Sequence, residues 1–242
     1  DEGLELGHRR GRARAGAEVA DLSQVYVIDL PEGADAALVA ARLSADPEVV
    51  YAHPDYRRTV EFVPDDPFFA SSGSWNQSYP DLWGLHAIGV EAAWEQSTGD
   101  GITVAVVDTG VATGHPDLAA NLWVNGGEIP ANGVDDDGNG YVDDHRGWDF
   151  ASGDNDPRDV FGHGTHVAGT IAAVGDNGRG VLGVSWRSRI MDVQVFDSSG
   201  SGLSSVLAQG IVYAAENGAD VINCSFGGRR ITPVMVDAIE TA

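Results

Sequence analysis

From residue 101 to the last residue, short apolar strands alternate with helical segments, and this alternation restricts the fold more than any other feature. The pattern predicts strands at 102–107, 190–196 and 221–224, and helices at 163–174, 206–216 and 231–242. The predicted strands are rich in β-branched residues and almost continuously apolar, which is typical of strands covered on both faces. We therefore expect an α/β fold with a parallel sheet between two layers of helices.

Two polar residues occupy positions where such a sheet presents reactive groups. Asp108 directly follows the strand predicted at 102–107, and His163 opens the helix predicted at 163–174. In open α/β sheets, sites form at the carboxyl ends of the strands. In hydrolytic triads an Asp orients a His, and the His takes a proton from a Ser; Asp, His, Ser is one of the established chain orders. Asp108 and His163 therefore fit the first two members of a triad.

The residues around both groups resemble the subtilases, a family of serine peptidases. Residues 104–110 (Val-Ala-Val-Val-Asp-Thr-Gly) are similar to the aspartate motif of that family, and residues 162–166 (Gly-His-Gly-Thr-His) to its histidine motif. The family's nucleophile motif, Gly-Thr-Ser-Met-Ala, does not occur in these 242 residues. The resemblance implies an incomplete subtilisin-like three-layer α/β fold in which Asp108 orients His163, and His163 acts as general base and then general acid.

A third segment, Ser225-Phe226-Gly227-Gly228, resembles the family segment that lines the substrate cleft. In subtilases a substrate strand pairs with two cleft edges through backbone hydrogen bonds. The resemblance assigns these edges to Gly200, Ser201, Gly202, Ser225, Phe226 and Gly227. Phe226 stands where relatives often carry Leu, so a bulkier cleft floor is expected. We interpret the neighbouring Cys224 as a small core side chain of a buried strand rather than a nucleophile, which would need an electropositive partner.

The chain is expected to consist of two parts, residues 1–61 and 62–242. Residues 25–28 read as a strand, residues 35–43 as a helix, and a second strand opens at Val49. This pattern resembles the second half of the inhibitory propeptide of subtilases. It implies a partial α+β propeptide with its linker, followed by the N-terminal part of a peptidase domain. We expect both ends to be cut, with the oxyanion Asn and the Ser lying beyond residue 242.

Charge and composition exclude several classes of function. The formal net charge is −23, and all 14 basic residues are Arg. A nucleic-acid partner is excluded because phosphate contacts require clustered positive charge. No stretch of about 18 apolar residues exists for a membrane span in this piece, and one Cys excludes an internal disulfide framework. The basic run at 8–14 is interpreted as an exposed connector, and Arg57-Arg58 as an ordinary exposed pair.

Much of the negative charge lies in an unusually long connection between the Asp and His motifs. Residues 135–144 place oxygen-bearing side chains at alternate positions before a Gly, as at the opening of an EF-hand calcium loop. Because position twelve is Arg146, Asp143 or Asp144 must close the shell. We favour Asp144, with Asp135, Asp137 and Asn139 as further ligands. A solvated acidic turn is the alternative.

Two more calcium sites are implied by the resemblance alone. The segment before His163 resembles a calcium loop of several subtilases, with Asp149, Asp154, Asp156 and Asp159 as ligands. A third site would use side chains and carbonyl groups that fasten the start of the mature enzyme to the catalytic domain. Its implied ligands are the side chains of Asp66, Asp117 and Asn177 and the carbonyls of Val174, Arg179 and Val181.

The sequence thus predicts a secreted, Ca²⁺-stabilised serine endopeptidase zymogen of the subtilase family. Its substrates would be proteins or peptides, and its own propeptide would be an intramolecular inhibitor. Without the nucleophile, the 242 residues are expected to hydrolyse nothing. The alternative is a non-catalytic calcium-binding or peptide-binding module descended from a peptidase. The intact Asp108 and His163 argue against it, because binding requires neither.

Overall fold

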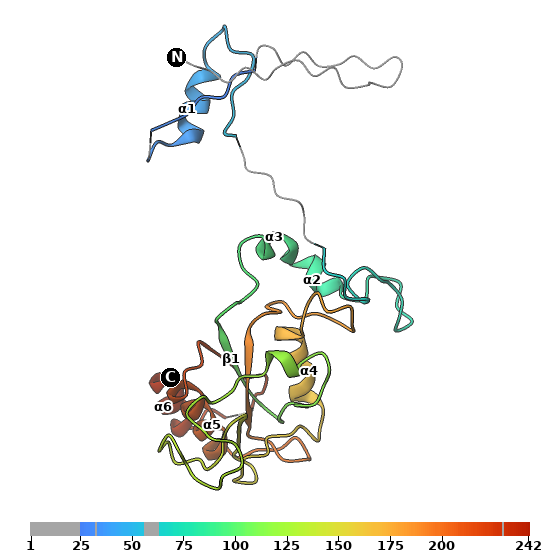
Figure 1. Cartoon of the computed structure of the whole chain (residues 1–242), viewed down its shortest axis with the longest axis vertical. Coiled ribbons are helices and arrows are strands. Elements are labelled where there is room, and N and C mark those ends of the chain that lie inside the picture. The colour runs from blue at the N-terminus through green and yellow to red at the C-terminus, as the bar shows by residue number, and fades with distance from the viewer. Residues whose placement is uncertain (1–24, 32, 56–62, 229) are drawn as a thin grey trace. The chain divides into compact units, whose positions relative to one another are not determined.

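The computed structural model describes residues 25–31, 33–55, 63–228 and 230–242 (Figure 1). The chain divides into two compact units, residues 1–60 and 61–242. The predicted connector at 8–14 and the pair Arg57-Arg58 lie outside the described residues. None of the helices in the described ranges is long and apolar enough to span a bilayer.

The first unit contains helix α1 (Ala36–Leu43), which begins as predicted. Asp35 caps it, because its carboxylate accepts the Leu38 N–H at 3.0 Å. The two strands predicted in this unit are wrong: residues 25–28 and 49–51 are unpaired among the described residues. A strand requires a second backbone. Instead, the Ser44 hydroxyl bonds both the N–H and the carbonyl of Ala52 at 3.2 Å and holds the second segment at the end of α1.

The second unit is built on a four-stranded parallel sheet in the order β2-β3-β1-β4. Its strands are β1 (Thr103–Asp108), β2 (Gly147–Asp149), β3 (Arg189–Gln194) and β4 (Val221–Asn223). The three strands predicted from apolar runs are present. Strand β2 was not predicted, because only three residues pair there within the acidic connection.

Helices cover both faces of this sheet, which confirms the expected three layers. Helix α4 (His163–Ala172) packs against one face and helix α5 (Ser204–Glu216) against the other, and helix α6 (Pro233–Thr241) packs against α5. Alternate residues of β1 supply the two cores: Val104 and Val106 face α4, whereas Ala105 and Val107 face α5. Asp108, the last residue of β1, therefore lies on the α4 face.

Shorter elements flank the sheet. Helices α2 (Trp83–Ala87) and α3 (Val90–Trp94) bury Leu85 and Trp94 in a separate apolar cluster with Phe69 and Trp186. A 3₁₀ turn, η1 (Ala119–Asn121), lies in the connection between the Asp and His motifs.

Candidate functional site

The predicted Asp and His meet at the carboxyl end of the sheet. His163 Nδ1 lies 2.7 Å from Asp108 Oδ1, and the Asp108 side chain is 1 % exposed whereas that of His163 is 47 % exposed. An ionised carboxylate can only accept, so Nδ1–H donates to it. In the neutral imidazole this bond places the ring proton on Nδ1 and leaves Nε2 as the acceptor nitrogen, which a general base requires.

Backbone conformation and close packing require small residues around His163. Gly162 precedes α4 at a φ of 101°, a left-handed conformation that favours glycine. At Gly164 a Cβ atom would lie 2.2 Å from the Gly110 carbonyl oxygen and 3.1 Å from the Asp108 Cβ. Helix α4 can therefore reach the end of β1 only because residue 164 has no side chain. This contact brings His163 within reach of Asp108.

The two predicted cleft edges follow the strands on either side of β1. Residues 200–202 come after β3, and residues 225–227 come after β4, and both strands pair directly with β1. The rings of Phe196 and Phe226 contact each other at 5.4 Å between centroids, so the segment after β3 meets the segment after β4. The two predicted edges follow the strands that flank β1, whose last residue is Asp108.

Cys224 does not lie in the core, so that prediction is wrong. Strand β4 ends at Asn223, and the Cys224 residue is exposed beyond it. Desolvation, and to a smaller extent the Asp108 charge, raise the pKa of the Cys224 thiol to about 11. The thiol therefore stays protonated at neutral pH, whereas a nucleophilic Cys needs its thiolate form.

The residues predicted for the N-terminal cation site are brought together. Asp66 and Asp117 are 2 % and 3 % exposed. Asp66 Oδ2 accepts the Asp176 N–H at 2.7 Å, whereas its buried Oδ1 has no hydrogen-bond partner among the described residues. Asp117 accepts the Asn177 side-chain amide at 2.8 Å and the Val181 N–H at 3.0 Å. Burial, and to a smaller extent the charge of Asp117, raise the pKa of Asp66 against the opposing hydrogen bonds. A buried carboxylate oxygen without a described partner, under the influence of a second buried carboxylate, fits a cation.

The acidic loop at 135–144 gathers only part of its predicted ligand set. Ligand atoms of Glu128, Asp137 and Asp144 lie within 4.8 Å of one another. Asp144 is fully buried and accepts hydrogen bonds from Asn139 at 3.0 Å and from the Tyr213 hydroxyl at 2.6 Å.

One residue of this loop and one residue before it behave differently from expectation. Asp135 accepts the backbone N–H groups of residues 138, 139 and 140, so its carboxylate shapes the turn. Glu128 was not predicted, because it lies seven residues before the periodic segment. An isolated acidic residue shortly before an acidic loop was the signal available for it.

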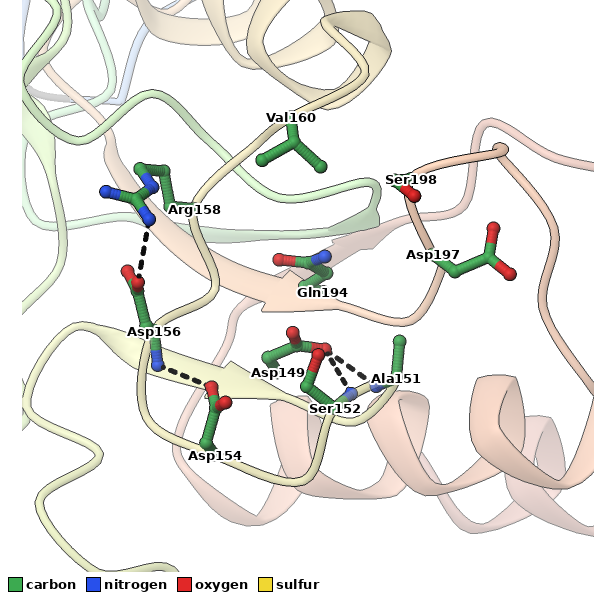
Figure 2. A pocket seen from close by; sticks show the side chains of 10 residues that line it. All are labelled: Asp149, Ala151, Ser152, Asp154, Asp156, Arg158, Val160, Gln194, Asp197 and Ser198. Carbon is green, nitrogen blue, oxygen red and sulfur yellow. Dashed lines mark hydrogen bonds and ion pairs between the residues drawn. The ribbon is translucent and has the colours of Figure 1, made fainter.

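The segment before His163 forms a pocket of about 320 Å³ (Figure 2). Asp149, Asp154 and Asp156 line it, and Asp156 pairs with Arg158 at 3.2 Å. Asp149 also accepts the N–H groups of Ala151 and Ser152. The predicted fourth ligand, Asp159, is not among the lining residues. Its carboxylate points toward Thr109 and Thr165.

The pocket floor contains a polar residue that sequence reasoning missed. Gln194 is 5 % exposed, and within the described structure its Oε1 atom has no hydrogen-bond partner. Asp192, two residues earlier on β3, is fully buried, and burial raises its pKa well above the usual value. The available signal was two polar residues at alternate positions of an otherwise apolar strand, which places both on one face.

Comparisons with known proteins agree with this geometry. The model of the subtilase family (peptidase S8) matches residues 99–241. Thermitase of Thermoactinomyces vulgaris is 38 % identical over 167 residues, which cover 69 % of this chain and 49 % of thermitase. A thermophilic serine proteinase of Bacillus sp. (strain AK1) is 35 % identical and is matched over 84 % of this chain and 43 % of its own length.

A solved structure is similar as well. A protease of Pseudoalteromonas arctica superimposes with a TM-score of 0.51 and 31 % identity over 74 % of this chain and 55 % of that structure. The chain spans about half the length of the curated relatives it matches.

Proposed function

Because this chain belongs to the subtilase family, we propose that the complete protein is a secreted serine endopeptidase. It hydrolyses peptide bonds of proteins or peptides by acyl transfer. The observation that carries the proposal is the 2.7 Å contact between His163 Nδ1 and the buried Asp108 carboxylate. A calcium-binding or peptide-binding module would need neither this contact nor the accessible Nε2 that it leaves.

The residues have distinct roles in the proposed reaction. A Ser beyond residue 242 attacks the scissile carbonyl, and His163 Nε2 takes its proton and later gives it to the leaving amine. Asp108 holds the imidazole and stabilises its cationic form during both transfers. Residues 200–202 and 225–227 bind the substrate backbone on both sides of the pair.

Peptidase activity of the full-length protein tests this proposal. We expect the wild-type protein to cleave a broad peptide library and the 242-residue chain to cleave nothing. His163→Ala and Asp108→Asn should each lower kcat by about 10⁴-fold or more. Only the weak catalysis that substrate binding alone provides should remain. The matched control is Asp100→Asn, which breaks a surface pair with Arg187. Full activity in either triad variant would refute the assignment.

We also propose that the first unit is part of an inhibitory propeptide. Its support is the propeptide-like sequence pattern and the exposed apolar residues Tyr26, Ile28 and Tyr51, which a bound partner would cover. The complete propeptide added in trans is expected to inhibit the mature enzyme at micromolar concentration. Unchanged cleavage rates at that concentration would exclude this role.

We propose Ca²⁺ as the ligand of the three acidic sites. Carboxylate and carbonyl oxygens are the donors that Ca²⁺ prefers. Asp66, Asp117 and Asn177 would hold one ion with the carbonyls of residues 174, 179 and 181. Asp137 and Asp144 would hold a second together with Glu128, and Asp149, Asp154 and Asp156 would hold a third. The bound ions would neutralise repulsion between the carboxylates and stiffen the loops.

A further inference from the structure

Asp159 is the most heavily hydrogen-bonded carboxylate near the catalytic pair. Its Oδ1 accepts the Thr109 hydroxyl at 3.0 Å and the N–H groups of Phe161 and Gly162 at 2.9 and 2.7 Å. Its Oδ2 accepts the N–H of Thr165 at 2.9 Å and the hydroxyl of the same residue at 2.6 Å. Five donors from three segments therefore converge on one side chain.

Thr109 links this carboxylate to both members of the pair. The Thr109 N–H donates at 2.7 Å to Asp108 Oδ1, the oxygen that also binds His163. The Thr109 hydroxyl, which donates to Asp159, accepts the Gly164 N–H at 2.9 Å. The residue after Asp108 and the residue after His163 are thus joined at a single hydroxyl group, and Asp159 fixes the orientation of that hydroxyl.

A second linkage passes through Thr165. Its hydroxyl donates to Asp159 and accepts the Ala112 N–H at 2.9 Å. The chain that leaves β1 is therefore bonded to the first turn of α4 at two points, Thr109 and Thr165. Donation to Asp159 fixes the direction of each hydroxyl proton and leaves the oxygen lone pairs free to accept the backbone N–H, because a hydroxyl has one proton and two acceptor sites.

From these contacts we propose that Asp159 is a positioning residue, whose carboxylate holds the β1 end and the first turn of α4 in the register that aligns His163 with Asp108. Asp159 touches neither the reacting atoms nor His163 itself. It acts through Thr109 and Thr165. The inference rests on the proposed peptidase activity for its kinetic consequence, but the geometry that it explains is independent of that activity.

The negative charge is part of the arrangement. Burial raises the pKa of Asp159, but the donors from Gly162, Thr165 and Phe161 outweigh it and lower the pKa below the usual value. The group is therefore ionised at neutral pH. It also lies at the positive end of the α4 dipole, where an anion is stabilised. A side-chain amide at this position would have one acceptor oxygen instead of two. Its NH₂ group would face some of the N–H and O–H donors that now bind the carboxylate.

The first experiment compares Asp159→Asn with wild type in the full-length protein, well below the melting temperature. We expect kcat to fall about ten-fold to a hundred-fold, since small misplacements of catalytic groups cost rates of this order. KM should change less than kcat, because the described hydrogen bonds of Asp159 do not include residues 200–202 or 225–227. Its link to the first of these edges is indirect, through Phe161, whose ring lies against Gly200. Asp100→Asn, an exposed carboxylate-to-amide control, should leave both constants unchanged.

A spectroscopic readout separates positioning from mere folding and does not need activity. The His163 Nδ1–H proton, hydrogen-bonded to Asp108, should give a strongly downfield NMR resonance in the wild-type protein. In Asp159→Asn that resonance should broaden or move upfield while the other resonances of the core stay in place. This measurement remains valid if the protein proves to have no peptidase activity, so the two proposals can fail separately.

Thr109 supplies a matched pair of variants. Thr109→Ser keeps the hydroxyl and should retain most of kcat, whereas Thr109→Val removes it and should match the loss in Asp159→Asn. The double variant Asp159→Asn with Thr109→Val should be little worse than either single change, because both disrupt one unit. An unchanged kcat and an unchanged downfield resonance in Asp159→Asn would overturn the inference, as would a lower melting temperature without either effect.

Discussion

At the scale of single residues, Asn121 fastens two parts of the second unit. Its side chain is buried, and Nδ2 donates to the carbonyl of Ala172 at 3.0 Å and to that of Trp186 at 2.8 Å. One carbonyl belongs to the last residue of α4, and the other to the turn before β3. A single side-chain amide thus bonds two carbonyl groups of buried residues.

Asn121→Ala is therefore expected to lower the free energy of unfolding by about 1–3 kcal/mol, because it removes two hydrogen bonds made by a buried side chain. Denaturant unfolding of the wild type and the variant measures this loss. Gln96→Ala, a change at an exposed residue, should stay within about 0.5 kcal/mol. Equal stability of Asn121→Ala and wild type would mean that another group takes over both acceptors.

Some residue roles could be predicted from the sequence and others could not. Asp108 and His163 stand in motifs whose positions at a strand end and a helix start leave few alternatives, and the structure places them in contact. Asp159 was grouped with the cation ligands because its segment resembles a calcium loop of several subtilases, and such a resemblance does not show where each carboxylate points. The direction depends on Thr109, which is 50 positions away.

At the scale of elements, periodicity predicted the helices and strands of the sheet to within a few residues at each end. It failed where an element depends on a distant partner. Strand β2 consists of three residues and forms only because β3 lies beside it. The apolar residues 25–28 have the composition of a strand but no described backbone to pair with. Local sequence encodes which face is apolar, whereas pairing depends on the whole chain.

The acidic loops give a prediction at this scale. Excess Ca²⁺ should stabilise the protein by about 2.7 kcal/mol per site at a hundred-fold excess over Kd. That corresponds to roughly 5–10 °C in melting temperature per site for a domain of this size. Calorimetry in Ca²⁺ and in chelator measures the shift, and identical melting curves would show that the loops are solvated turns.

One substitution separates the N-terminal site from the others. Asp66→Asn removes a buried carboxylate close to Asp117, so it should reduce the Ca²⁺-dependent shift. In chelator the same variant should be at least as stable as wild type, since the repulsion between the two carboxylates is gone. The unpartnered Oδ1 atom of Asp66 is the reason for expecting this opposite sign. A full Ca²⁺ shift in Asp66→Asn would exclude Asp66 as a ligand.

At the scale of the whole molecule, the net charge of −23 is larger than the charge that bound cations would neutralise. Three Ca²⁺ ions would cancel six charges, so the surface would stay strongly acidic. Acidic residues outside the cation sites would therefore still keep the surface solvated. The division into two units and the family match to residues 99–241 both assign the catalytic pair to the second unit.

The central claim is that Asp108 and His163 activate a serine of the same protein, and covalent labelling tests it most directly. A fluorophosphonate reacts with a serine only when a neighbouring base activates its hydroxyl. Treatment of the full-length protein followed by mass spectrometry should find one labelled serine, C-terminal to residue 242. The label should be lost in His163→Ala and kept in Asp100→Asn. Absence of any labelled serine in the folded full-length protein, or labelling that persists in His163→Ala, would contradict the account.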